Sequence, residues 1–186
     1  MKSIRPFKRL VRAIRNNRVN IFVGIPSIYN IFKDFKFPKI FASRDISCIM
    51  EDSNENLWIG TYESGILKEN KDNNTFTSYH LGNGFPSNKI KAIYEDKQKD
   101  IWIGTATAGV CRYRNGKFDN FDEKSGLKGN HVTSICEDSD GNIWFGNYGH
   151  GLNRLYNNTF LSKEEIQESL ASLVVCIMED REGGLW

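Results

Sequence analysis

Four copies of one segment follow each other along this 186-residue chain. Each copy contains a Glu-Asp pair followed, six residues after the Asp, by a tryptophan; the pairs begin at Glu51, Glu95, Glu137 and Glu179. The period is therefore 44, 42 and 42 residues. A fixed period of this length indicates a repeat architecture, in which each unit buries its apolar face against its neighbours because it cannot do so alone.

Each copy has the pattern of four short strands separated by polar turns. In the first copy the apolar and β-branched stretches are 47–51, 57–61, 66–69 and 75–80. Four strands in about 42 residues form one antiparallel sheet, and such sheets arranged around an axis make a β-propeller. A parallel solenoid would use shorter units. We therefore predict an all-β fold, a partial ring of about four four-stranded antiparallel blades.

The expected blades are residues 46–89, 90–131, 132–173 and a truncated copy at 174–186. A seven-bladed ring at this period needs about 300 residues, so a fragment is the simplest interpretation. A closed four-bladed ring is the alternative, with amino-terminal strands completing the sheet that begins at Val174. Against it, residues 20–24 resemble a second strand, which Trp186 already starts. In the third copy, Ser162 to Glu165 form a capping box that predicts a short helix through Leu170.

The recurrent tryptophans have two interpretations. A ring wedged between sheets would bury on the order of 200 Å², whereas a platform for sugar stacking would be exposed. Recurrence in every unit favours packing, and we expect the glycine two residues after each of Trp58, Trp102 and Trp144 to give the ring room. The segment from Asp138 to Asn142 could also start a calcium loop, but Gly and Glu are missing at loop positions six and twelve. Tight hairpin turns are therefore expected after each Glu-Asp pair.

These repeats resemble the two-component regulator propeller repeat. The resemblance depends on Ile-x-Glu-Asp, a turn, Trp-(Ile/Phe)-Gly-(Thr/Asn), and a Gly four residues later, as in Glu95, Asp96, Trp102, Gly104 and Gly109. It covers residues 46–160 well and 174–186 in part. It implies the periplasmic or extracytoplasmic sensor region of a hybrid two-component regulator, responding to carbohydrate fragments. The kinase elements of such proteins are not found in this sequence.

Residues 1–44 differ in character, with eleven basic residues against the single acidic Asp34. A degenerate blade is the favoured interpretation, because residues 20–24 mimic a second strand with Phe22 in place of Trp. The positively charged end of a signal peptide is the second, although its apolar core would be interrupted by Asn20 and Pro26. A nucleic-acid-binding arm is the third and weakest, and we expect no nucleic-acid partner.

Composition and spacing limit the other functional classes. No apolar run is long enough for a membrane helix, so no membrane contact is expected within this chain. The four cysteines occupy strand positions without a Cys-x-x-Cys pair, which predicts reduced, structural thiols and no metal. We expect no cofactor. His131 and His150 leave open a propeller lyase, as in streptogramin-inactivating enzymes, and a structural protein-interaction propeller is a further alternative.

The principal hypothesis is a non-catalytic propeller that binds a carbohydrate or other small ligand through the loops at one end of its sheets. These loops differ between copies, at 62–64, 106–108 and 148–150. The candidate ligand-binding residues in them are Tyr62, Thr107, Tyr148 and His150. Because an open arc of blades exposes a sheet face at each end, self-association through these faces is also expected.

Overall fold

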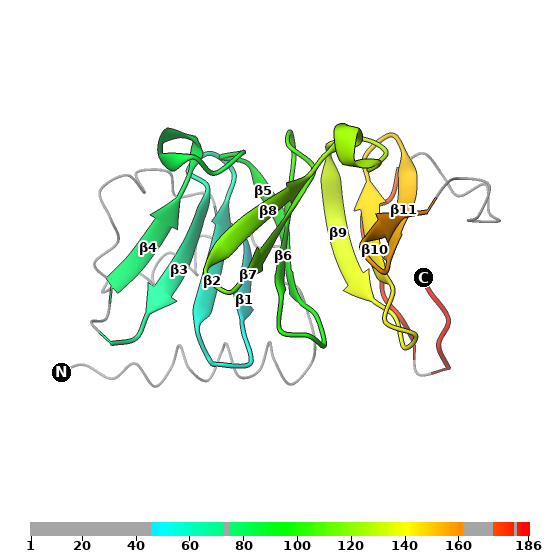
Figure 1. Ribbon diagram of the computed structural model, residues 1–186, viewed down its shortest axis with the longest axis horizontal. Coiled ribbons are helices and arrows are strands. Elements are labelled where there is room, and N and C mark those ends of the chain that lie inside the picture. The colour runs from blue at the N-terminus through cyan, green and yellow to red at the C-terminus, as the bar shows by residue number, and fades with distance from the viewer. Residues whose placement is uncertain (1–45, 73–74, 162–172, 181) are drawn as a thin grey trace.

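The computed structural model describes residues 46–72, 75–161, 173–180 and 182–186, and its regular structure is three antiparallel four-stranded sheets (Figure 1). Blade 1 contains β1 (Ile46–Glu51), β2 (Leu57–Thr61), β3 (Ile66–Asn70) and β4 (Thr75–Tyr79). Blade 2 contains β5 (Ile90–Glu95), β6 (Ile101–Thr105), β7 (Val110–Arg114) and β8 (Lys117–Phe121). Blade 3 contains β9 (Val132–Glu137), β10 (Ile143–Asn147), β11 (Gly151–Tyr156) and β12 (Thr159–Phe160). The proposed degenerate blade at 1–44 and the short helix expected after Ser162 lie outside the described residues.

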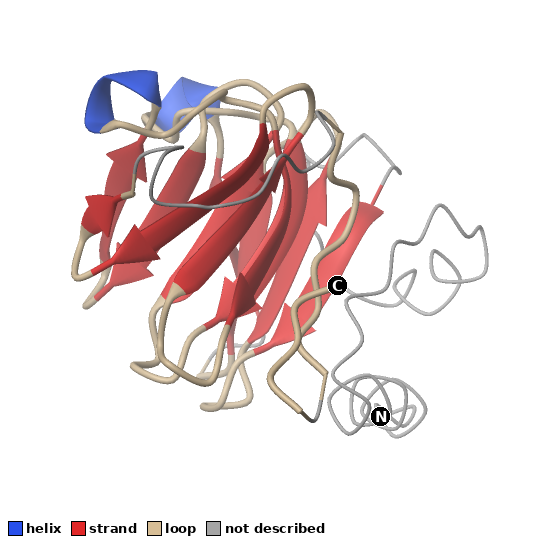
Figure 2. Cartoon of the chain, turned by 90° about the vertical axis from the view of Figure 1, so that its right-hand side faces the viewer, coloured by secondary structure: helices blue, strands red, loops and turns tan. Residues whose placement is uncertain are grey.

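In each blade the strands follow one another in sequence order, so every pairing is between chain neighbours. The first strands of the blades, β1, β5 and β9, contact one another across the blade boundaries and form the inner edge of the arc. The last strands form the outer edge. Figure 2 shows the sheets stacked with their faces toward each other. This arrangement confirms the predicted partial β-propeller.

Two short 3-10 helices connect consecutive blades at one end of the sheets. They are η1 (Leu81–Asn83), after β4, and η2 (Glu123–Ser125), after β8. The side chain of Asp122 accepts hydrogen bonds from the backbone N–H groups at the start of η2, as His80 does at η1. In the described ranges, no helix is long and apolar enough to cross a membrane.

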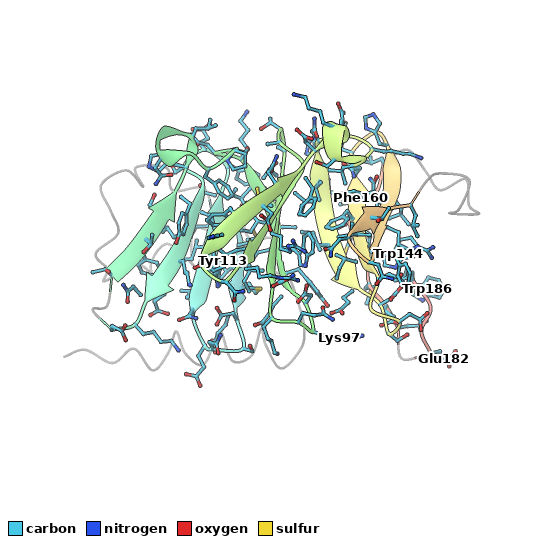
Figure 3. The ribbon with its side chains drawn as sticks, viewed as in Figure 1. Lys97, Tyr113, Trp144, Phe160, Glu182 and Trp186 are labelled. Atoms are coloured by element: carbon cyan, nitrogen blue, oxygen red, sulfur yellow. The ribbon has the colours of Figure 1, made fainter. Side chains whose placement is uncertain are left out.

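The apolar cores lie between the blades. One core joins Trp58 and Ile66 of blade 1 to Ile101 and Ile103 of blade 2. A second core joins Trp102 of blade 2 to the apolar face of blade 3. Figure 3 shows side chains filling both spaces between the sheets. Trp58, Trp102 and Trp144 are only 0%, 2% and 8% exposed, which excludes a sugar platform there. Trp58 and Trp102 lie in the cores between neighbouring sheets, as predicted.

The glycines after the tryptophans have a different role from the one expected. A Cβ on Gly60 would lie 2.6 Å from Cys48 Sγ and 2.6 Å from Ile90 Cγ2, and one on Gly104 would lie 2.9 Å from Val132 Cγ1. Ile90 and Val132 belong to the inner strand of the following blade. The missing side chain therefore allows that strand to approach, and the prediction that glycine makes room for the indole ring was wrong.

The fourth copy forms the first hairpin of a further unit. Backbone hydrogen bonds run in both directions between Met178 and Trp186, and Asp180 N–H donates to Gly184 O across the turn. Its first residues lie beside blade 3, where Val174 N–H donates to Asn147 O. Trp186 is 77% exposed, unlike its three equivalents, because no described sheet covers its outer face (Figure 3).

Candidate functional site

The two ends of the sheets carry different kinds of connection. The first and second strands of each blade are joined at one end by the Glu-Asp hairpins, at the bottom of Figure 1; we call this the turn end. The second and third strands are joined at the opposite end, where η1 and η2 also lie; we call this the loop end. The predicted ligand-binding residues all belong to the loop end.

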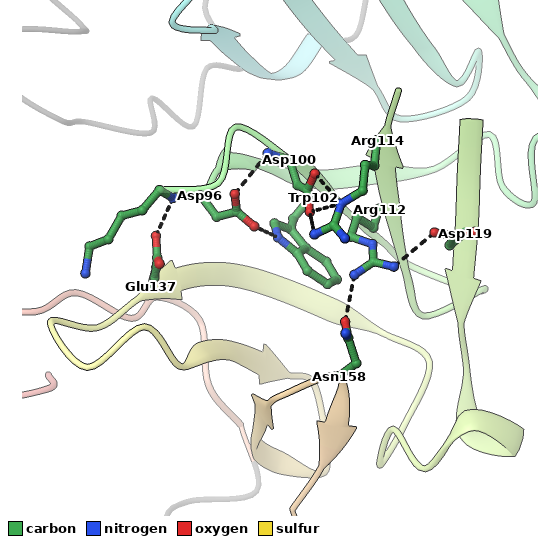
Figure 4. A network of polar contacts seen from close by, with 9 residues as sticks. Asp96, Asp100, Trp102, Arg112, Arg114, Asp119, Glu137 and Asn158 are labelled. Carbon is green, nitrogen blue, oxygen red and sulfur yellow. Dashed lines mark hydrogen bonds and ion pairs between the residues drawn. The ribbon is translucent and has the colours of Figure 1, made fainter. Parts of the chain in front are cut away.

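The Asp of each Glu-Asp pair holds both its turn and its tryptophan. In the second copy Asp96 accepts hydrogen bonds from Asp100 N–H at 2.9 Å and from Trp102 Nε1–H at 2.7 Å (Figure 4). The same indole bond recurs in the other copies, with Asp52, Asp138 and Asp180 as acceptors. Turn formation by Asp was predicted, but its bond to the indole was not. The constant spacing of six residues between Asp and Trp was the signal for it.

In the second, third and fourth copies, the Glu of the pair binds the preceding blade. Glu95 accepts the backbone N–H of Ser53 at 2.8 Å, and Glu137 accepts that of Lys97 at 2.7 Å. Glu179 likewise accepts Ser139 N–H. The turns of the first three copies are therefore each bound by the Glu carboxylate of the next copy. The Glu-Asp pair is a structural device, with one residue acting inside a blade and the other between blades.

A basic side chain covers each of the three buried tryptophans. Lys68, Arg112 and Arg154 pair in register with Trp58, Trp102 and Trp144 on the adjacent strand. Their charged groups lie 5.2 to 5.6 Å from the indole centroids, within cation–π range. Arg112 also donates to Asn158 Oδ1 of blade 3 (Figure 4). The Asp, Glu and Trp side chains of the repeated turns therefore form contacts that hold the blades together at the turn end.

At the loop end, a buried threonine braces the loop of the first two blades. Thr105 Oγ1 donates to Gly109 O at 2.9 Å and accepts Ala108 N–H at 2.9 Å, and Thr61 does the same in blade 1. Asn147 occupies this position in blade 3 and is fully buried, yet neither atom of its side-chain amide has a hydrogen-bond partner. The loop at 148–150 therefore lacks the brace of its equivalents.

The predicted site residues divide into two groups. Tyr62 and Tyr148 are 37% and 57% exposed and occupy the same repeat position in blades 1 and 3. Thr107 is exposed but forms a 2.9 Å hydrogen bond with Ser87 Oγ, which links its loop to the connection before β5. The ring of His150 lies directly over Gly129 of the preceding connection. The tyrosines thus have partly exposed rings, while Thr107 and His150 contact neighbouring loops.

The structure adds Lys91 and His131 to this end. Lys91 Nζ lies over the Tyr62 ring, 4.8 Å from its centroid, and His131 stacks on Tyr148 with 5.1 Å between centroids. Burial, and then the positive charge of Lys91, lower the pKa of His131. His131 was considered only as a catalytic group, and Lys91 was missed. A comparison of the copies could have found Lys91, because Ser47 and Thr133 hold its position in blades 1 and 3.

The cysteines match the sequence interpretation. All four are free, and burial raises the pKa of the Cys48 and Cys111 thiols to about 12, which makes them unreactive. Across the described ranges, no three His, Cys, Asp or Glu side chains are grouped so that they could hold a metal ion.

Comparison with known proteins shows which family and which solved structures these repeats resemble. Residues 40–63, 84–107 and 126–149 match the family described as two component regulator propeller. The extracellular domain of a hybrid two-component system from B. thetaiotaomicron is 29% identical, with a TM-score of 0.64; the match covers 78% of this chain and 20% of that one. A second such domain from the same organism is 23% identical, with a TM-score of 0.57, over 74% and 21%.

Virginiamycin B lyase from Staphylococcus aureus shares the fold at 22% identity, with a TM-score of 0.59, over 76% of this chain and 47% of the lyase. At that identity the likeness concerns the fold alone. The chain spans about a fifth of the length of the two-component domains that it matches. No curated protein matches the sequence.

Proposed function

For this chain, which is built of two-component regulator propeller repeats, we propose a non-catalytic sensor function: its loop end binds a small ligand, a carbohydrate fragment, outside the cytoplasm. The 29% identical relative is an extracellular domain of a hybrid two-component system, which supports a sensory role and an extracytoplasmic site. A propeller of this kind recognises its ligand through loops that vary while the sheets stay constant.

The exposed tyrosines of the loop end carry this proposal. Trp58, Trp102 and Trp144 are buried, whereas Tyr62 and Tyr148 are exposed rings of the loop end that can offer a face to a sugar. Rings of this kind present a large, rigid apolar surface together with a hydroxyl group, which suits a ligand with both apolar and polar faces. Tyr148 follows Asn147, whose side-chain amide has no hydrogen-bond partner among the described residues, so its loop lacks the side-chain brace of the first two blades.

The histidines of the alternative lyase hypothesis have other contacts. His131 is stacked on Tyr148, and His150 covers Gly129. Neither forms a hydrogen bond with an acidic side chain in the described part of the chain, so neither has the partner that would orient a general base. The proposed function is therefore binding without turnover.

Calorimetric titration of the chain with a panel of neutral and acidic oligosaccharides tests the proposal. We expect at least one saccharide to bind, and Tyr148→Ala to weaken it about tenfold because a stacking surface is removed. Tyr156→Ala is the matched control, since Tyr156 is a similarly exposed tyrosine at the turn end. Failure of the whole panel to bind, or an equal loss in both variants, would overturn the proposal, as would ring-opening of a streptogramin by the chain.

A further inference from the structure

A row of aromatic and basic side chains crosses all three blades at the loop end. It consists of Tyr62 from blade 1, Lys91 from blade 2, and His131 and Tyr148 from blade 3; we call it the rim row. Lys91 contacts the Tyr62 ring, and His131 stacks on Tyr148. Burial, and then the charge of Lys91, lower the pKa of His131. The rim row therefore consists of two contacting pairs, one that joins blade 1 to blade 2 and one in blade 3.

A β-bulge places Lys91 in this row. The register of β5 with β6 shifts between Ile90 and Ala92, so Lys91 is the extra residue of the bulge. Bulges redirect a side chain out of the regular alternation of a strand. Thr133, at the equivalent position in blade 3, uses its hydroxyl to bond Gly146 O and Val174 O. Lys91 forms no equivalent hydrogen bonds among the described residues. Its side chain extends over Tyr62 of the preceding blade instead.

Among the described residues, no carboxylate lies within ion-pair distance of the Lys91 ammonium group. The face of a tyrosine attracts a cation without cancelling its charge. The loop end has acidic residues of its own, Glu63 and Glu123, but none of the described ion pairs joins them to Lys91. The Glu-Asp pairs lie at the turn end, where Glu95 and Glu137 bind neighbouring turns. The exposed Lys89, two residues before Lys91, adds a second positive charge at this end. The rim row can therefore attract an anion.

We propose that the rim row selects acidic saccharides, those carrying a carboxylate such as a uronic acid, over neutral ones. This inference rests on the proposed function and specifies its ligand class. Lys91 supplies a charge-assisted hydrogen bond to the carboxylate, and Tyr62 and Tyr148 offer flanking ring surfaces to the sugar. Discrimination arises because a neutral ligand would leave the ammonium group without a partner while displacing its water.

The test compares trigalacturonic acid with its fully methyl-esterified form, which keeps the same sugar rings without the charge. Calorimetry on the complete chain at low ionic strength measures both affinities; trimannuronate and a neutral galactotriose extend the series. We expect the acid to bind at least about tenfold more tightly than its ester, and the difference to shrink as salt is added.

Variants assign the effect to the rim row. Lys91→Gln should weaken the binding of the acid about tenfold more than that of the ester, because the charge-assisted bond is lost only to the acid, whereas the lost contact with Tyr62 affects both ligands. Lys124→Gln is the matched control: it removes an exposed positive charge from η2 at the same end, outside the rim row. Its affinity for the acid should stay within about twofold of the unmodified chain.

The outcomes separate the two proposals. Tighter or equal binding of the neutral saccharides, or equal losses in Lys91→Gln and Lys124→Gln, overturns the selection of acids and leaves the saccharide sensor intact. No binding of any saccharide overturns the sensor function itself and the inference with it. Circular dichroism of Lys91→Gln identifies any loss that comes from unfolding; if that variant does not fold, the ratio of acid to ester affinity in the unmodified chain decides the question.

Discussion

At the scale of single residues, the same side-chain types meet in every copy. A buried indole N–H needs an acceptor, and the Asp six residues earlier supplies it while also forming the turn. A basic group covers the ring from the adjacent strand. Since a buried polar group without a partner costs more free energy than a satisfied one returns, this Asp should carry much of the stability of its blade.

Replacing Asp96 with alanine tests that expectation. Asp96→Ala leaves the Trp102 indole N–H and the turn amide of Asp100 without their acceptor, and should lower the free energy of unfolding by about 2–4 kcal/mol. Urea titration followed by tryptophan fluorescence measures it. Asp119→Ala is the control, because the Asp119 carboxylate is 54% exposed and, in the described residues, forms an ion pair only with Arg112, which is expected to contribute less than about 1 kcal/mol. Equal losses would refute this role.

Acid should weaken the third blade through Asp138. Burial alone would raise the pKa of this carboxyl, but hydrogen bonds from Trp144, Asn142 and the turn backbone outweigh burial, and the net pKa is lowered. Its stabilising effect is therefore fully present above the unfolded value of 3.8 and is lost as pH falls through the lower folded value. Denaturation at a series of pH values should show a smaller acid loss in Asp138→Asn than in the unmodified chain. Identical slopes below about pH 4 would contradict it.

Asn147 offers a gain of stability. Asn147→Thr should restore the brace that Thr61 and Thr105 provide, and should replace an unsatisfied buried amide with a satisfied hydroxyl. We expect a gain of about 1–2 kcal/mol. The reverse change, Thr105→Asn, is the matched control and should lose at least as much. Thermal unfolding of the two variants measures both, and destabilisation by Asn147→Thr would show that the amide has a partner in solution.

At the scale of elements, the inner strands of blades 2 and 3 pack against a glycine of the blade before them. A Cβ on Gly104 would lie only 2.9 Å from Val132 Cγ1, and a Cβ on Gly60 would lie only 2.6 Å from Ile90 Cγ2. The distance between neighbouring blades is therefore set by one small residue opposite one branched residue. Added volume in such a contact must be accommodated by displacement of the adjoining sheet, since interiors are close-packed.

Gly104→Ala should consequently destabilise the fold by about 1–3 kcal/mol. Val132→Ala removes the methyl groups that the new Cβ would meet, at its own cost as a core truncation. The double variant should lose less stability than the two single variants together, because Val132→Ala removes the atoms that the new Cβ would meet. A double-mutant cycle of urea unfolding measures the coupling. Strict additivity would show that Val132 does not set the blade spacing.

At the scale of the whole molecule, the described residues form an arc of three blades and one hairpin. Val175, Met178 and Trp186 of the fourth copy are exposed apolar side chains on that hairpin. Exposed apolar surface favours association when it is large enough. The expected self-association through open blade faces therefore stays a prediction, now assigned to a particular hairpin.

Light scattering after size-exclusion chromatography should show a mass that rises with protein concentration. Met178→Glu should reduce that rise by introducing a charge into the apolar surface. Leu81→Glu is the control, because Leu81 is equally exposed but lies on η1, at the loop end of blade 1. A single monomeric mass at every concentration, or the same effect of both substitutions, would contradict the assignment.

Much of this architecture could be predicted from the sequence. The period of the Glu-Asp pairs, the strand pattern within each copy and the Gly-containing turns specified four-stranded blades, because these features depend on residues close together in the chain. The burial of the tryptophans followed from their recurrence. The candidate loops were also located correctly at one end of the sheets, and Tyr62 and Tyr148 are exposed there as a binding role requires.

The tertiary structure determined which side chains contact one another between blades. Glu137 bonding to the turn at Lys97, Lys91 covering Tyr62, and Gly104 facing Val132 all join residues that lie about 30 to 40 positions apart. A local pattern cannot place such pairs, because their distance depends on how one rigid sheet is set against the next. Repetition determined the shape of each blade, and the stacking of blades determined which side chains meet at the loop end.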